Sequence, residues 1–267
     1  MTRQSTGAGQ ASLRAVALPS EHGGWGFTLE PVLLGLLVAP GWAALGLGIA
    51  AVAAFLARHP LRLWLTDRRR GARYPRTGLA ARIGLGFAAV SAAGLALAVG
   101  SASAPFWWPL ALGALLALLQ LRYDARLRGR HIVPEVSGAV AMASVAAAIA
   151  LAGGRPVSVA AGLWLVLAMR AVAALFYART QVMRARGVAA SPAGAYVAEG
   201  AALVVLVASA AWGLSPWLSA LGLGLLGLYS TYTFARPPLP ARLVGWGQMV
   251  FGLLMVLLTA VGVRVGL

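Results

Sequence analysis

The chain has 267 residues, of which 60% are hydrophobic and only 10% are charged, which leaves too few polar side chains to cover a water-soluble globule of this size. Its formal charge of +16 comes from arginines that lie in short runs between apolar segments of spanning length, a pattern that indicates a membrane protein and excludes nucleic-acid binding as the explanation. The chain has no cysteine, so it can form neither a disulfide nor a thiolate metal site.

The N-terminal residues 1–18 are polar and contain Arg3 and Arg14. No apolar core with a small-residue cleavage site follows them, so we expect a retained cytoplasmic tail and not a signal peptide. The remainder, 19–267, has no room for a separate soluble domain. We expect it to form a single transmembrane domain.

Nine apolar segments bounded by glycine, proline or arginine follow the tail. Backbone groups in hydrocarbon must be satisfied within a segment, and these alanine- and leucine-rich segments are too long for barrel strands, so we expect helices. The predicted fold is an all-α bundle with spans at roughly 27–40, 43–66, 79–99, 105–121, 134–153, 157–178, 193–212, 215–234 and 243–263.

The arginines predict the orientation of these spans. With nine spans and the N-terminus inside, all but two of the 22 arginines fall on one face, and the exceptions are Arg155 and Arg264. Positive residues concentrate in cytoplasmic loops, so we expect the basic face to lie in the cytoplasm and the protein to reside in the bacterial cytoplasmic (inner) membrane.

The segment before the first span contains an acid, an imidazole and three glycines. Glu21 and His22 are candidates for acid–base catalysis, and the glycines would let the backbone amides approach an anion. The same segment is also typical of an interfacial turn anchored by Trp25. Both interpretations stay open at this point.

Ionisable residues within spans are costly and usually face a partner or a cavity. At a rise of about 1.5 Å per residue, Arg58, His59, Arg170 and Glu199 lie at a similar depth, with Glu30 slightly shallower. Arg170 and Glu199 are on consecutive antiparallel helices, so we predict a buried ion pair between them. They form either a self-neutralising structural pair or, with Glu30, part of a polar pocket in which His59 is a further catalytic candidate.

Surplus arginines in the same region predict an anion-binding site. Arg58 and Arg62 are four residues apart and share a helix face, and Arg179 and Arg184 lie at the inner end of the sixth span. The planar guanidinium suits phosphate-type groups because it offers two parallel donors. The run 68–76 is most simply a topology determinant that contacts anionic lipid headgroups. We expect no metal and no other cofactor.

Three short motifs resemble the YwiC-like family of bacterial membrane proteins. They are LPSEHGGWG at 18–26, EPVLLG at 30–35 and RHPL at 58–61. The resemblance implies a membrane protein and carries no assigned activity.

A more distant resemblance is to the UbiA superfamily of intramembrane prenyltransferases. It rests on nine helices, an inside N-terminus, PVLLG in the first span and basic loops after spans two and six. In that family two Asp-rich motifs hold magnesium and an isoprenoid diphosphate. The corresponding stretches here are 58–67, whose only acid is Asp67, and 177–186, which contains no acid. The resemblance therefore implies a pocket without the family's metal chemistry.

These observations predict a cytoplasm-facing pocket of Arg, His and Glu that binds an amphiphile with an anionic, phosphate-type head. An isoprenoid phosphate or a membrane lipid fits best. The alternatives are a divergent metal-independent prenyltransferase, and a transporter or accessory subunit of a membrane complex.

Overall fold

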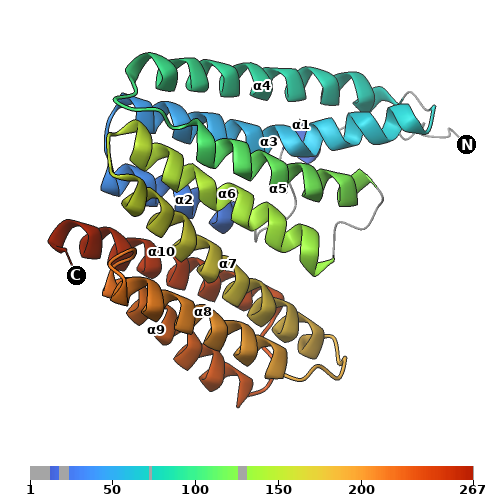
Figure 1. Cartoon of the computed structure of the whole chain (residues 1–267). Coiled ribbons are helices and arrows are strands. Elements are labelled where there is room, and N and C mark those ends of the chain that lie inside the picture. The colour runs from blue at the N-terminus through green and yellow to red at the C-terminus, as the bar shows by residue number, and fades with distance from the viewer. Residues whose placement is uncertain (1–12, 18–23, 72–73, 126–130, 267) are drawn as a thin grey trace, which may run out of the picture.

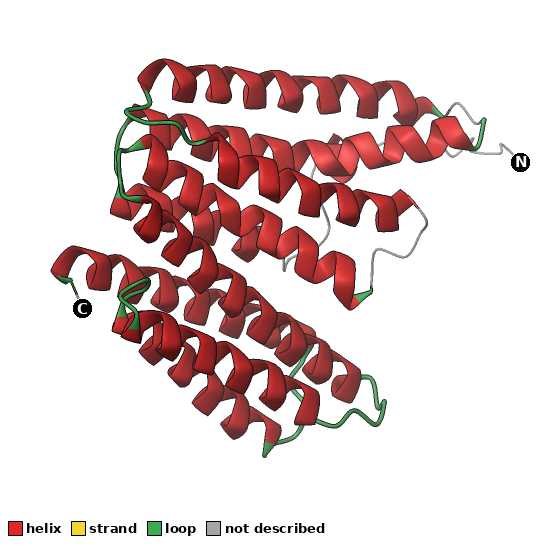
Figure 2. Ribbon diagram, viewed as in Figure 1, coloured by secondary structure: helices red, strands yellow, loops and turns green. Residues whose placement is uncertain are grey.

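The computed structural model describes residues 13–17, 24–71, 74–125 and 131–266, and in this part of the chain helices joined by short loops are the only regular secondary structure (Figures 1 and 2). A short helix, α1 (Leu13–Ala17), falls within the expected tail. The longer helices are α2 (Gly24–Val38), α3 (Trp42–Arg69), α4 (Pro75–Ser101), α5 (Trp107–Ala125), α6 (Ile132–Ala152), α7 (Val157–Ala185), α8 (Ala193–Ala211), α9 (Trp217–Phe234) and α10 (Ala241–Val265).

The helices α2 to α10 correspond one to one with the nine expected spans, which confirms the all-α transmembrane fold. Six of them, α3, α4, α6, α7, α8 and α10, are long and apolar enough to cross a membrane by length and composition. The helix α2 is apolar but short, with 15 residues. The helices α5 and α9 have 19 and 18 residues and carry more polar side chains near their C-terminal ends.

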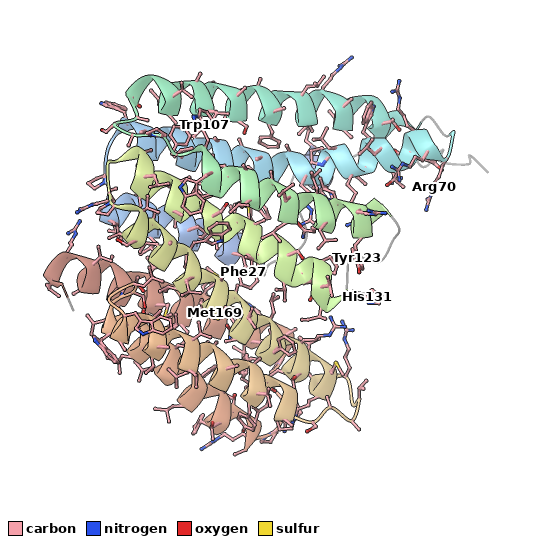
Figure 3. All side chains as sticks on the ribbon, in the orientation of Figure 1. Phe27, Arg70, Trp107, Tyr123, His131 and Met169 are labelled. Atoms are coloured by element: carbon pink, nitrogen blue, oxygen red, sulfur yellow. The ribbon has the colours of Figure 1, made fainter. Side chains whose placement is uncertain are left out.

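The alternation of helix direction gathers most arginines of the described residues at one end of the bundle, called here the basic end. It contains the C-terminal ends of α3, α5, α7 and α9 and the N-terminal ends of α4, α6, α8 and α10. In Figure 3, Arg70, Tyr123 and His131 mark this end and Trp107 marks the opposite one.

The helices α2, α6, α7 and α10 form the centre of the bundle (Figure 1). The α3–α4 hairpin packs on one flank, through α2 and α6, and the α8–α9 pair packs on the other, through α7 and α10. The C-terminal half of α6, from Ala143 to Ala152, is buried throughout, and six of its ten residues are alanine, whose small side chains let neighbouring helices approach closely.

Glycines permit the closest helix crossings. A Cβ on Gly46 would lie 2.6 Å from the carbonyl oxygen of Gly94, and a Cβ on Gly94 would lie 2.7 Å from the carbonyl oxygen of Gly46. The backbones of α3 and α4 therefore touch at these two residues. Such small-residue contacts are the usual basis of helix association in lipid, where there is no hydrophobic drive between helices.

The two arginines at the end opposite the basic end both bind the C-terminal carbonyls of α2. Arg155 donates from Nη2 and Nε to the Val38 oxygen at 2.7 and 3.1 Å, and Arg264 donates from Nη2 to the Leu37 oxygen at 2.8 Å. The last carbonyls of a helix have no partner within it, so these arginines satisfy groups that would otherwise be orphaned. Their position opposite the other arginines thus has a structural reason.

Candidate functional site

A buried ion pair joins three central helices. Arg170 on α7 donates from Nη2 to Oε1 of Glu30 on α2 at 3.0 Å and to the backbone oxygen of Gln248 on α10 at 2.6 Å. Arg170 is 2% exposed. Breaking one side of such a buried pair would leave an uncompensated charge in the bundle, so the contact fixes α2, α7 and α10 relative to one another.

The pair fits because a glycine faces it. A Cβ on Gly252 of α10 would overlap Oε1 of Glu30 and would lie 2.7 Å from Nη2 of Arg170. The other nitrogens of the guanidinium, Nε and Nη1, are buried and have no hydrogen-bond partner among the described residues. A charged group left in this state is costly in the membrane interior.

The structure corrects the predicted partner of Arg170. We expected Glu199, but Arg170 pairs with Glu30, and Glu199 on α8 instead accepts a hydrogen bond from Ser230 Oγ on α9 at 2.5 Å. Sequential neighbours are the simplest choice from sequence alone. The bundle instead places α2 and α10 beside the Arg170 face of α7, and Glu199 faces α9.

The four arginines predicted to bind an anion lie on two helices with α6 between them. On α3, Arg58 donates from both Nη atoms to the side-chain oxygen of Gln120, at 3.1 and 3.2 Å, with the Gln120 amide turned so that its oxygen faces the guanidinium. Arg62, on the same helix, is exposed. On α7, Arg179 lies 3.5 Å from Glu135 of α6, and Arg184 donates to the backbone oxygen of Phe234 at 3.1 Å.

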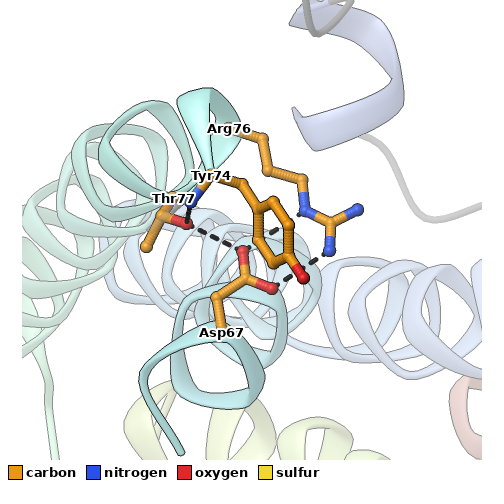
Figure 4. A network of polar contacts seen from close by, with 4 residues as sticks. All are labelled: Asp67, Tyr74, Arg76 and Thr77. Carbon is orange, nitrogen blue, oxygen red and sulfur yellow. Dashed lines mark hydrogen bonds and ion pairs between the residues drawn. The ribbon is translucent and has the colours of Figure 1, made fainter. Parts of the chain in front are cut away.

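A second polar centre lies at the basic end of the α3–α4 hairpin (Figure 4). Asp67, 1% exposed, accepts hydrogen bonds from Arg76 Nη2 at 3.0 Å, Arg76 Nε at 3.3 Å and Thr77 Oγ1 at 2.9 Å. Thr77 Oγ1 also accepts from the backbone amide of Tyr74 at 3.1 Å. The carboxylate thereby ties the last turn of α3 to the first turn of α4.

This network supports a cleft of about 490 Å³, lined by Trp64, Arg68, Gly71, Tyr74, Thr77, Gly78 and Ala81. The guanidinium of Arg68 lies over the Trp64 ring, 4.8 Å from its centroid. Arg76 lies over Tyr74 in the same way, at 4.9 Å. The cleft therefore combines a cation, a hydroxyl and two aromatic rings at one end of the bundle.

The same hairpin carries an apolar groove closer to the middle of the bundle. The groove has a volume of about 380 Å³ and lies between α2, α3 and α4. Its lining consists of Gly48 and apolar side chains only: Val32, Leu36, Leu45, Ile49, Val52, Ala53, Leu56, Phe87 and Val90. It can accept a hydrocarbon chain.

Two of the catalytic candidates, Glu21 and His22, lie outside the described residues. His59 is half-buried in α3, directly before Pro60, and the helix continues through both residues. Within the described ranges, no three His, Asp or Glu side chains converge in a group that could hold a metal ion. The catalytic roles stay predictions.

Comparison with known proteins gives the family. Residues 18–150 match the family model described as YwiC-like protein. The chain belongs to the YwiC-like family. No curated protein matches it. The match in this YwiC-like protein runs from before α2 to the last turn of α6. It contains Glu30, Asp67 and both the cleft and the groove of the α3–α4 hairpin, whereas Arg170 lies beyond it.

Sequence reasoning missed the cleft of this YwiC-like protein. It took the run 68–76 as a topology determinant, although one signal was present. Asp67 is the only acid between residues 58 and 101, in a stretch with eight arginines. A single carboxylate among so many cations is expected to be paired and to organise the local structure.

Proposed function

We propose that this YwiC-like membrane protein binds an amphiphile with an anionic, phosphate-type head, and that its basic end faces the cytoplasm of a bacterial inner membrane. The single observation that carries the proposal is the cleft at the end of the α3–α4 hairpin, where Arg68 stands beside Trp64, Tyr74 and Thr77. Asp67 accepts its hydrogen bonds from Arg76 and Thr77, so the neighbouring guanidinium of Arg68 stays available for an anion.

The chemistry of the cleft suits a phosphate head at the membrane surface. A guanidinium donates two parallel hydrogen bonds to phosphate oxygens, and a threonine hydroxyl can donate a third. Tryptophan and tyrosine favour the headgroup level, where one side of the ring is apolar and the other is wet. The head needs no metal ion, because arginine supplies the positive charge directly.

The apolar groove suits the tail of the same ligand. Leu56, at the end of the groove nearest the cleft, lies eight residues before Trp64 on α3, which corresponds to a rise of about 12 Å. A head in the cleft and a chain along α3 and α4 would match the way a lipid or an isoprenoid phosphate lies in one leaflet. Three of the four arginines predicted from the sequence, Arg58, Arg62 and Arg179, would supply a second, deeper cationic layer on α3 and α7, whereas Arg184 lies at the basic end.

The test is the affinity for phosphatidic acid, measured by native mass spectrometry of the protein in detergent. Arg68→Gln should weaken binding about tenfold, the equivalent of about 1.4 kcal/mol. Arg122→Gln is the matched control, because it removes an exposed arginine from the same end of the bundle, on α5. It should leave the affinity within about twofold. Arg68→Lys should recover only part of the loss, because an ammonium lacks the planar fork.

Four further outcomes decide the details. Excess EDTA should not change the affinity, and inorganic phosphate should not compete at equal concentration because it has no tail. Equal losses from Arg68→Gln and Arg122→Gln would refute the cleft and leave only general surface attraction. A loss from Arg58→Gln or Arg179→Gln, with Arg68→Gln unchanged, would move the head to the deeper layer.

A further inference from the structure

The buried face of α7 carries a polar stripe. Arg170, Tyr177, Gln181 and Arg184 are separated by seven, four and three residues, so at 3.6 residues per turn they share one face of the helix. Tyr177 and Gln181 are 0% exposed. The stripe rises about 21 Å, from the basic end of the bundle to the Glu30–Arg170 pair.

Five polar atoms of this stripe are buried without a hydrogen-bond partner in the part of the chain that the structure describes. Tyr177 is satisfied by Thr233 of α9, at 3.0 Å. The amide of Gln181 lies beside the Tyr177 hydroxyl but forms no well-aligned hydrogen bond at either atom, and Nη1 of Arg184 and Nε and Nη1 of Arg170 have no partner within the described residues. Buried polar groups are normally hydrogen-bonded, so this concentration on one helix face calls for a partner beyond the described residues, such as water.

The opposing helices continue the stripe across the helix interface. The side-chain amide of Gln248 on α10 is also buried without a partner among the described residues, and the backbone carbonyl of this same residue binds Arg170. The Tyr229 hydroxyl of α9 lies next to Gly247, where an added Cβ would come within 2.6 Å of it. The helices α7, α9 and α10 thus share a polar seam that leads from Arg184 to Arg170.

We propose that this seam is a hydrated path through which small anions reach Arg170 from the basic end of the bundle. Water molecules with two to four polar neighbours are the usual partners of buried groups of this kind. The unpartnered atoms of the seam are five nitrogens, all donors, and two amide oxygens. The excess of donors, three of them on guanidinium groups, favours an anion over a cation.

The path ends at Arg170. On the same face of α7, Val166 is the next residue towards the opposite end, and it is 0% exposed within an apolar cluster that also contains Met255 and Leu226. Thr259 Oγ1 is the next unpartnered polar atom, seven residues beyond Gly252 on α10, a rise of about 10 Å. The seam is therefore a half-channel that opens on one side only.

Cysteine labelling tests the path directly, because the chain has no cysteine of its own. Gln181→Cys and, as its matched control on the same face, Val166→Cys are made singly and treated with anionic methanethiosulfonate ethylsulfonate or its cationic trimethylammonium analogue. The Gln181 variant should react at least tenfold faster than the Val166 variant, and faster with the anionic reagent. Equal, slow labelling of both folded variants shows a dry seam and overturns the proposal, as does a preference for the cationic reagent.

A measurement on the unmodified protein removes any dependence on the variants. Radiolytic hydroxyl-radical footprinting oxidises side chains beside bound water even where bulk solvent does not reach. Tyr177 should be oxidised, whereas Met255, whose thioether is a ready target of oxidants but which lies beyond Arg170, should be spared. Oxidation of Met255 without Tyr177 would also overturn the path. Neither experiment involves phosphatidic acid or Arg68, so the seam and the amphiphile site stand or fall separately.

Discussion

The ion pair between Arg170 and Glu30 allows a double-mutant cycle with a built-in control. Replacing Arg170 by Leu leaves the Glu30 carboxylate buried, and replacing Glu30 by Leu leaves the guanidinium with only the Gln248 carbonyl. At 3.0 Å and an effective dielectric constant of about 20, the attraction is about 5.5 kcal/mol. Desolvation offsets part of it, so each single change should lower the free energy of unfolding by about 3 to 5 kcal/mol.

The double change Arg170→Leu with Glu30→Leu should cost clearly less than either single change, because two apolar side chains can fill the site without an unpaired charge. The coupling energy is then about 3 kcal/mol or more. The assay is reversible unfolding by sodium dodecyl sulfate in mixed micelles, followed by circular dichroism, with the same slope required for all variants.

The control cycle combines Arg170→Leu with Glu199→Leu. Glu199 bonds to Ser230, and the ion pair and hydrogen bonds of Arg170 go to Glu30 and Gln248 instead, so these two changes should add within about 0.5 kcal/mol. A coupling near zero in the cycle with Glu30, together with a large one in the cycle with Glu199, would refute the observed pairing and restore the one expected from helix order.

Three other predictions concern packing and topology. Gly252→Ala should destabilise the protein by about 1 to 3 kcal/mol because the new methyl group displaces the ion pair, whereas Gly245→Ala on the same helix meets nothing and should be neutral or stabilising in the same unfolding assay. Gly46→Ala should separate α3 from α4 and lower the thermal midpoint. A cysteine at Ser103 should react with an impermeant periplasmic reagent in cells and one at Ala189 should not; the reverse pattern would invert the orientation.

The helices were predictable because each apolar segment must satisfy its own backbone in lipid. The capping role of Arg155 and Arg264 could not be predicted, since counting charges in loops treats every arginine as a topology signal. Only the three-dimensional arrangement shows that both hold carbonyls of α2. A side chain that caps a distant helix has no local sequence signature.

The partner of Arg170 was missed for a related reason. Depth along a helix follows from counting residues, and the sequence correctly indicated that Arg170, Glu30 and Glu199 lie within the spans. Which helices are neighbours depends on packing, and Gly252, which leaves space for Glu30 beside Arg170, shows no periodic pattern that would reveal its role. Polar residues could be placed in a layer by the sequence but not assigned to pairs.

The contacts of α2 bear on how the protein is made. This helix is the first of the nine to leave the ribosome, and at about 22 Å it is shorter than the hydrocarbon of a bilayer. The partner of Glu30, Arg170, is synthesised 140 residues later. The arginines that bind the C-terminal carbonyls of α2 follow 117 residues after Val38, for Arg155, and 227 residues after Leu37, for Arg264. Until residue 170 has been made, α2 carries an unpaired acid, and its C-terminal carbonyls are fully capped only after residue 264 has followed. We therefore expect the insertion machinery, or the hairpin that α2 forms with α3, to keep α2 away from lipid until α10 has been inserted.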